Sequence, residues 1–275
     1  MALNMISNHS ANVGHRNVSQ TNAKLSLALA RLSAGQRVLS AKDDAASLAI
    51  GSRLAAETSG LRQAGVNAGQ GASLLQVADG AYSQISDIMT RMKTLAVQAS
   101  SGQIGASDRQ AINTEFQALA SEVDRIAADT DFAGTNLLDG SVTNLSFKVG
   151  TGTSPGADDI SVAFDAGSTT ALGINGADIS SVASANAAIN SLGAAIDSVQ
   201  TFRANIGASS NRLGYAASNI ATAVENAEAA RSGLLDLDMA QGVSDLANRQ
   251  TAMQTGLYSL TQANQKSSFM LRLMA

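Results

Sequence analysis

The sequence predicts a mainly α fold of long antiparallel helical rods in a coiled coil, with a small β-hairpin region at the turn-around. Apolar residues recur every seven positions in both halves of the chain, which is the spacing of a coiled-coil seam. Only one of the 275 residues is proline, a residue that breaks helix interiors, and aromatic residues make up only 3%. A core of Leu, Ile, Val, Met and Ala, with few aromatic side chains, suits thin helical bundles better than stacked sheets and helices.

The first long helix is predicted from Asp44 to Ser100. A seam sustained over about six heptads indicates a coiled coil rather than an ordinary helix. At 1.5 Å per residue this helix would span roughly 85 Å. The positions seven apart are Leu54, Leu61, Ala68, Leu75, Tyr82, Met89 and Ala96, and the offset positions are Ala64, Gly71, Ala78, Ile85, Met92 and Ala99.

A shorter helix is predicted to follow the break "SSGQIGASD" and to fold back antiparallel to the first. Ser107 is expected to cap this helix, with Gln110 three residues later completing a capping box. Its apolar stripe consists of Ile112, Phe116, Leu119, Val123 and Ile126.

The middle of the chain, from about Asp131, is rich in turn-forming residues. Within it "LSFKVG" and "DISVAF" alternate apolar and polar residues, and the loop between them holds Pro155. This pattern predicts a β-hairpin that is too short to build a large second domain.

Helix resumes near Val182 as a second rod whose length matches the first, and each end of the chain adds a terminal helix. Matched lengths and opposite directions predict that the two halves pair with each other. The seam of the second rod is Leu192, Val199, Ile206, Leu213, Ile220, Ala227 and Leu234. The terminal seams are Leu25, Ala28, Leu32 and Leu39 at one end, and Val243, Leu246, Met253, Leu257, Leu260 and Leu271 at the other.

Composition excludes several classes of function. The net charge is −4 with scattered Lys and Arg, which argues against nucleic-acid binding. No run approaches 18 apolar residues and the N-terminus lacks the apolar core of a signal peptide, so neither membrane insertion nor cleaved-signal secretion is expected. The chain has no cysteine, and His9 and His15 do not have zinc-motif spacing. With no catalytic constellation, we expect no enzyme activity, metal or cofactor.

The triplet Lys42, Asp43 and Asp44 allows two interpretations. Paired carboxylates can bind Mg²⁺ or act as acid and base, but adjacent helix residues do not face one another. Asp also stabilises the first turn of a helix, where backbone N–H groups are unpaired. We therefore interpret the triplet as a helix joint, in which Gly35 loosens the first helix and the Asp pair starts the second.

Several long motifs resemble those of bacterial flagellin, the filament protein of the flagellum. The N-terminal half holds "RLSAGQRVLSAKDDAASLAI", "GLRQAGVNAGQGASLLQVADGA", "MKTLAVQAS" and "FAGTNLLDG". The C-terminal half holds "FRANIGASSNRL", "LLDLDMAQ", "LTQANQ" and "LRL". These motifs occur in the family's order and cover roughly residues 1–150 and 185–275.

The resemblance implies a structural subunit that self-assembles into the extracellular filament for swimming. Residues 1–40 and 236–275 would form an inner terminal coiled coil, 41–140 and 180–235 a rod domain, and 141–179 a short surface segment. Because isolated helices as polar as the terminal ones are marginal in water, they are expected to become ordered on assembly. The resemblance also implies export of the unfolded chain by the flagellar type III system. Implied partners are further copies, an export chaperone, and cap and hook-associated proteins.

Two alternatives remain at this point: a hook–filament junction protein or another coiled-coil scaffold. Junction proteins usually have Ser-Asp-Asp-Pro at the acidic joint, whereas this chain has "AKDDAA", which favours flagellin. The resemblance further assigns Arg91, Leu95 and Glu115 to a possible face for an innate-immune receptor. Thr94 stands where strongly recognised members usually have Glu.

Overall fold

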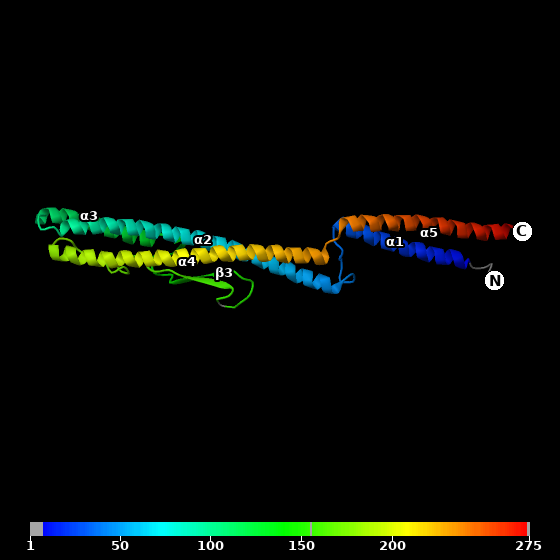
Figure 1. The fold of residues 1–275 in the computed structure, drawn as a ribbon, viewed down its shortest axis with the longest axis horizontal. Coiled ribbons are helices and arrows are strands. Elements are labelled where there is room, and N and C mark those ends of the chain that lie inside the picture. Colours follow the sequence, from blue (N-terminus) through cyan, green and yellow to red (C-terminus); the bar gives the residue numbers. More distant parts are fainter. Residues whose placement is uncertain (1–7, 155, 274–275) are drawn as a thin grey trace. The chain divides into compact units, whose positions relative to one another are not determined.

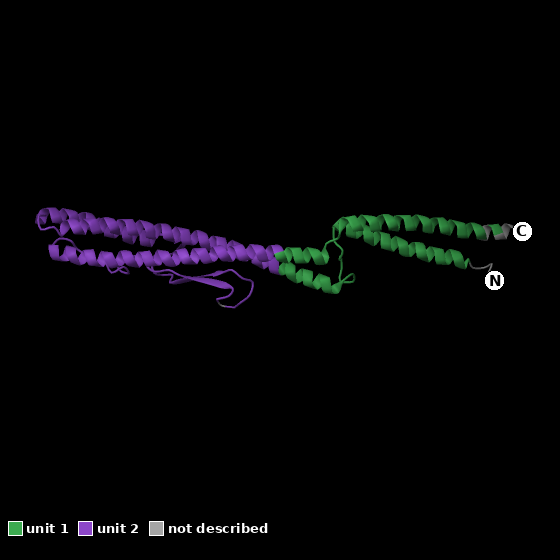
Figure 2. Ribbon diagram, in the orientation of Figure 1, with its two compact units in different colours: residues 1–56, 226–275 green, residues 57–225 purple. Residues whose placement is uncertain are grey.

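The computed structural model describes residues 8–154 and 156–273 and confirms the mainly α fold (Figure 1). The chain separates into two compact units (Figure 2). Unit 1 combines residues 1–56 and 226–275, and unit 2 is residues 57–225. The helices are α1 (His9–Ala34), α2 (Ala45–Ala99), α3 (Ala106–Asp129), α4 (Val182–Leu235) and α5 (Met239–Leu273). The strands are β1 (Asp131–Phe132), β2 (Thr135–Asn136), β3 (Asn144–Lys148) and β4 (Asp159–Ala163).

In unit 2, α2 and α4 pack antiparallel along the predicted seams. Arg203 of α4 donates to Asp79 of α2 at 2.8 Å, and Gln200 donates to Ser86 at 3.1 Å, so later residues of α2 meet earlier residues of α4. Most of the predicted rod seam is buried: Leu75, Ile85, Met89, Leu192, Val199, Ile206, Leu213 and Ile220. Leu54 in unit 1 and Leu61 in unit 2 are half-buried.

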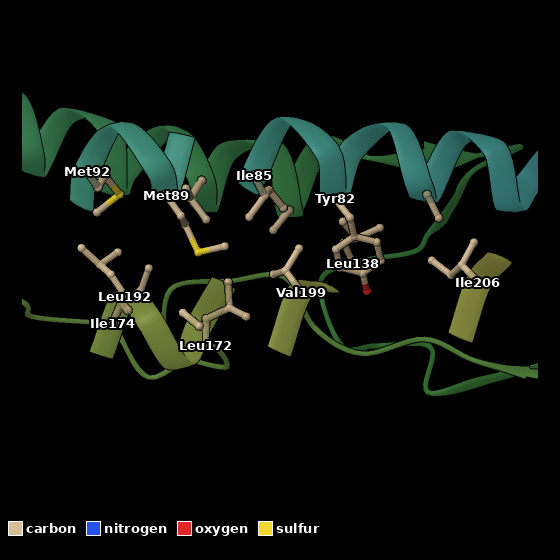
Figure 3. Packing of buried hydrophobic residues seen from close by; sticks show 14 of the residues in the cluster. Tyr82, Ile85, Met89, Met92, Leu138, Leu172, Ile174, Leu192, Val199 and Ile206 are labelled. Carbon is tan, nitrogen blue, oxygen red and sulfur yellow. The ribbon is translucent and has the colours of Figure 1, made fainter. Parts of the chain in front are cut away.

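The core of unit 2 forms where segments outside the two rods cover the seam. Figure 3 shows Tyr82, Ile85 and Met89 of α2 with Val199 of α4 and Leu138 of the connecting segment. Leu172 and Ile174 from the loop before α4 close the same cluster (Figure 3).

Although aromatic residues are scarce, two of them occupy the centre of this core. Tyr82 and Phe116 are fully buried, at positions predicted in the seam of the first rod and in the apolar stripe of the shorter helix. The ring of Tyr82 lies 5.8 Å from that of Phe202, and its hydroxyl donates to the backbone carbonyl of Asp165. Burial, reinforced by the Asp165 carboxylate, raises the pKa of the Tyr82 hydroxyl. Its hydrogen bond satisfies the one polar atom that burial of the ring would otherwise leave unpaired.

The start of α3 differs from the prediction. Gly105 is the N-cap residue and no side chain caps the helix, so the capping box at Ser107 and Gln110 is wrong. Instead, the buried side chain of Arg109 organises the turn between α2 and α3. Its guanidinium donates to the carbonyls of Ala99 at 2.8 Å and Ile104 at 3.0 Å, which are groups that a helix end and a tight turn leave unpaired.

Polar side chains of α3 fasten the loop that precedes α4. Asp124 accepts hydrogen bonds from the backbone and hydroxyl of Thr169, at 2.8 and 2.9 Å. Further along, the Asn113 amide oxygen accepts from the backbone N–H of Ile179 at 3.1 Å. These bonds satisfy backbone groups of an irregular segment that is partly buried.

The predicted β-hairpin is confirmed as the antiparallel pair β3–β4, in which Phe147 is opposite Ile160. It lies against α2, because Asn67 donates to the Lys148 carbonyl at 3.2 Å. Gly71 makes this docking possible: a Cβ atom there would lie 2.9 Å from the Phe147 ring, a distance that side-chain atoms do not tolerate. A smaller hairpin pairs β1 with β2.

We predict that Leu75→Asp destabilises unit 2, because it places a carboxylate in a seam position that is fully buried. The expected loss of unfolding free energy is at least about 3 kcal/mol, measured by urea unfolding with circular dichroism. Val77→Asp is the matched control, since Val77 lies two residues away but is exposed, and it should cost less than about 1 kcal/mol. Equal losses for the two variants would show that Leu75 does not lie in a seam.

Candidate self-assembly surface

The terminal pair, helices α1 and α5, is an antiparallel two-helix coiled coil. Asn8 at the start of α1 donates to the Ala263 carbonyl near the end of α5 at 3.2 Å. At the other end of the pair, Gly242 lies against Leu32, and a Cβ atom on Gly242 would be 3.3 Å from it. Two helices shield each other on one side only, and α1 accordingly has no buried residue.

The predicted terminal seam is only partly in this contact. Leu25, Leu32, Leu246, Met253 and Leu260 are half-buried. Leu39 lies beyond the end of α1 and is exposed, while its neighbour Val38 is buried instead, so the extension of the helical seam to Leu39 is wrong. Leu271 lies outside the residues whose side chains the structure describes.

Leu257 is also wrong as a residue of the contact between α1 and α5, because its side chain is 46% exposed. Gly256 takes the seam position, since spacings of three and four alternate along a helical face. Val18 of α1 approaches so closely there that a Cβ on Gly256 would lie 3.1 Å from its side chain.

The outer sides of the terminal pair carry exposed apolar side chains. Two of them, Val243 and Leu257, were predicted in the seam and lie outside it, and the heptad pattern did not identify the others. The exposed ones are Leu27, Leu29, Val243, Leu257, Tyr258, Phe269 and, at the start of α5, Met239. Full burial of such a side chain is worth about 1.5–3 kcal/mol, so covering these side chains favours association. For the residues outside the predicted seam, the sequence did contain a signal for this exposure, namely an apolar residue at a helix position that the seam does not use.

The joint, residues 35–44, connects α1 to α2 and is held by the segment between α4 and α5. Gly35 ends α1 in the left-handed conformation, at φ 67°, which glycine adopts without strain. An isolated β-bridge joins Gln36 to Asp236. On either side of it, the N–H of Arg37 donates to the Leu235 carbonyl at 2.7 Å, and that of Leu237 donates to the Gly35 carbonyl at 2.9 Å.

Within the joint, Lys42, Asp43 and Asp44 lie between α1 and α2. Asp43 accepts hydrogen bonds from the backbone N–H groups of Leu39 and Ser40, at 3.3 and 3.2 Å, and pairs with Arg31 at 3.1 Å. Desolvation opposes its ionisation, but the bonds from Ser40 and Leu39 and the charge of Arg31 outweigh it. The pKa of Asp43 is therefore lowered.

Asp44 starts α2 as a helix-capping residue. Its carboxylate accepts from the Ser47 hydroxyl at 2.6 Å and from the Ser47 N–H at 3.0 Å, and these bonds lower its pKa. Lys42 is exposed in the turn before it. Across residues 8–154 and 156–273, His and acidic side chains form no cluster that could hold a metal ion.

The possible receptor face is only partly at the surface. Arg91 of α2 and Glu115 of α3 are exposed and form an ion pair of 2.7 Å. Leu95 is 2% exposed, because it lies on the same apolar helix face as Met92 and Ala99 in the core of unit 2. Its assignment to an exposed face is therefore wrong.

The fold and the surface together define a class of protein: a protein of long helices whose two terminal helices pair and expose apolar side chains. Family models described as the bacterial flagellin N-terminal and C-terminal helical regions match residues 6–143 and 189–274. The chain belongs to the bacterial flagellin family. None of the described helices is apolar over a stretch long enough to cross a bilayer.

Relatives are similar over different shares of their length. The chain is 34% identical to the flagellar filament 33 kDa core protein of Treponema phagedenis, over 98% of this chain and 100% of that protein. It is 43% identical to flagellin A of Vibrio cholerae over 151 residues, which are 55% of this chain and only 40% of that relative. The crystal structure of Bacillus cereus flagellin matches 56% of this chain and 88% of its own, with a TM-score of 0.50 at 28% identity.

We predict that the joint loosens in acid. Because the pKa values of Asp43 and Asp44 are lower in the folded chain, their stabilisation is present above the ordinary carboxyl pKa and is lost as pH falls below about 4. Hydrogen exchange of residues 39–47, corrected for its intrinsic pH dependence, should show this loss of protection. Asp43→Asn should lower the protection at neutral pH and flatten the profile.

Asp197→Asn is the control for that experiment, since it removes the same charge from an exposed position in unit 2. Superimposable profiles for wild type and Asp43→Asn would mean that the carboxylate does not hold the joint.

Proposed function

We propose that this chain is a structural subunit that polymerises through its terminal pair into an extracellular bacterial flagellar filament used for swimming. The observation that carries the proposal is the apolar surface left exposed on α1 and α5. Family membership and the name of the Treponema phagedenis relative, a filament core protein, support it.

The terminal pair needs a partner for energetic reasons. A helical coiled coil with no fully buried residue on α1 gains little from the hydrophobic effect, and ordering its helices costs conformational entropy. Additional copies that cover Leu27, Leu29 and Tyr258 would supply the missing burial. We therefore assign residues 1–40 and 236–275 to an inner assembly domain, 41–140 and 180–235 to the rod, and 141–179 to the surface segment.

We further propose that the chain is exported unfolded by the flagellar type III system, with an export chaperone, a cap protein and hook-associated proteins as partners. The absence of cysteine supports passage of an unfolded chain, because no disulfide can form on the way. Any recognition by a host innate-immune receptor would use the exposed pair Arg91 and Glu115 rather than Leu95.

We predict that removing residues 262–275 abolishes polymerisation while the protein stays soluble and keeps the helical signal of α2 and α4. The truncation shortens α5 and removes exposed Phe269, so fewer apolar groups are left to bury on assembly. Sedimentation and negative-stain microscopy would measure the outcome.

The control variant carries a short epitope tag inserted after Gly152, in the exposed loop between β3 and β4, which lies outside the terminal pair. Tagged chains should still form filaments that bind the antibody along their length. Normal filaments from the truncated chain would refute a role of the terminal pair in assembly.

A further inference from the structure

A small pocket lies on the terminal pair close to the joint, entirely within unit 1. Its volume is about 230 Å³. Leu27 and Ala28 of α1 and Leu237 before α5 form its apolar lining. An apolar cavity of about 150 Å³ can hold a benzene ring, so this pocket has room for one aromatic side chain.

The charged groups around that apolar lining carry a net positive charge. Lys24, Arg31 and Arg249 contribute three cations, and Asp245 contributes one carboxylate. Arg31 pairs with Asp43, but its buried Nε has no hydrogen-bond partner. Among the residues that the structure describes, the side chains of Lys24, Asp245 and Arg249 make no hydrogen bond or ion pair.

An aromatic ring with a polar tip matches both parts of this pocket, whereas a carboxylate would match only its cations and an aliphatic group only its apolar lining. Cations at the edge of the pocket attract the face of a ring, and the apolar lining receives its carbon atoms. A hydroxyl at the tip can donate to Asp245. Few carboxylates of unit 1 could compete with such a ring for the pocket. Asp43, Asp44 and Asp238 already accept hydrogen bonds from their own segments.

Tyr258 provides such a group, with a side chain that is 75% exposed. It follows Arg249 by nine residues on α5, and nine steps of about 100° put the two residues on opposite sides of the helix. Tyr258 therefore points away from the pocket of its own chain. Phe269 is the other described aromatic exposed in unit 1, but it has no hydroxyl to offer Asp245.

We infer that Tyr258 of one copy inserts into the pocket formed by Leu27, Ala28 and Leu237 of a second copy. A projecting residue and its receptor pocket on opposite sides of one subunit make a head-to-tail contact, which repeats in an open array rather than closing into a dimer. The inference rests on the proposed polymerisation and names one of its contacts.

The absence of native cysteine allows a direct test by disulfide cross-linking. Chains carrying Tyr258→Cys and Ala28→Cys are polymerised, oxidised and run on a non-reducing gel. We expect a ladder of covalent multimers from filaments and none from the unassembled protein. The control pair, Tyr258→Cys with Ser26→Cys, keeps the first cysteine and moves the second to an exposed position of α1 outside the pocket, so it should give no ladder.

A second measurement covers the case in which loss of Tyr258 itself impairs assembly. Tyr258→Ala should raise the critical concentration for polymerisation about tenfold or more, as loss of an aromatic anchor does, and Tyr258→Phe should raise it less. Tyr215→Ala, which removes an equally exposed ring from unit 2, should leave it unchanged.

Filaments that form normally from Tyr258→Ala, or a ladder that arises from Phe269→Cys with Ala28→Cys instead, would overturn this contact while leaving the proposed function intact. Failure of the unaltered chain to polymerise at all would overturn both.

Discussion

Two helices packed against each other have no interior, and this constraint governs the terminal pair. Each helix shields one strip of its partner, so the apolar side chains described in the seam remain partly within reach of water on their flanks. α1 accordingly contains no buried residue, although its seam spacing is regular. Apolar side chains outside the seam, such as Leu29 and Tyr258, then have nothing within unit 1 to cover them. A sequence of this kind is consistent with a structure that other copies complete.

Unit 2 shows how the same heptad spacing behaves once further segments are added. α3, the β3–β4 hairpin and the loop before α4 cover the seam of α2 and α4, and Tyr82 becomes fully buried there. Polar groups that accompany this burial are satisfied individually: Tyr82 donates to a carbonyl, and Arg109 caps the end of α2. The difference between the two units therefore lies in coverage rather than in the pattern of the helices.

Spacing along a helix could be predicted because it is a local property. The heptads anticipated α2, α4 and the buried positions Leu75 and Leu213, and alternation anticipated β3 and β4. Features that depend on a distant neighbour could not be read in this way. Leu95 is buried because of the tertiary packing around it, and Gly256 replaces Leu257 in the seam because Val18 approaches it. The burial of Arg109 could not be predicted either, because a charged side chain is normally exposed and here it is buried only because the turn between α2 and α3 supplies carbonyl partners.

The joint has no heptad spacing, yet its residue types predicted how its two helix ends are stabilised. Asp44 has the residue type and the position of a helix-capping residue, and Gly35 has those of a helix end. The β-bridge from Gln36 to Asp236 was not predictable, because it pairs segments that are 200 residues apart and consists of backbone groups that any sequence provides.

Hydrogen exchange on unassembled and assembled protein tests most directly whether the terminal pair depends on other copies. Amides of α1 and α5 should exchange within the fastest class in the unassembled chain and become strongly protected after polymerisation, while the buried stretch of α2 around Tyr82 should be protected in both states. Protection of α1 and α5 in the unassembled chain as strong as that around Tyr82 would contradict the account, because the two-helix pair would then be stable without a partner.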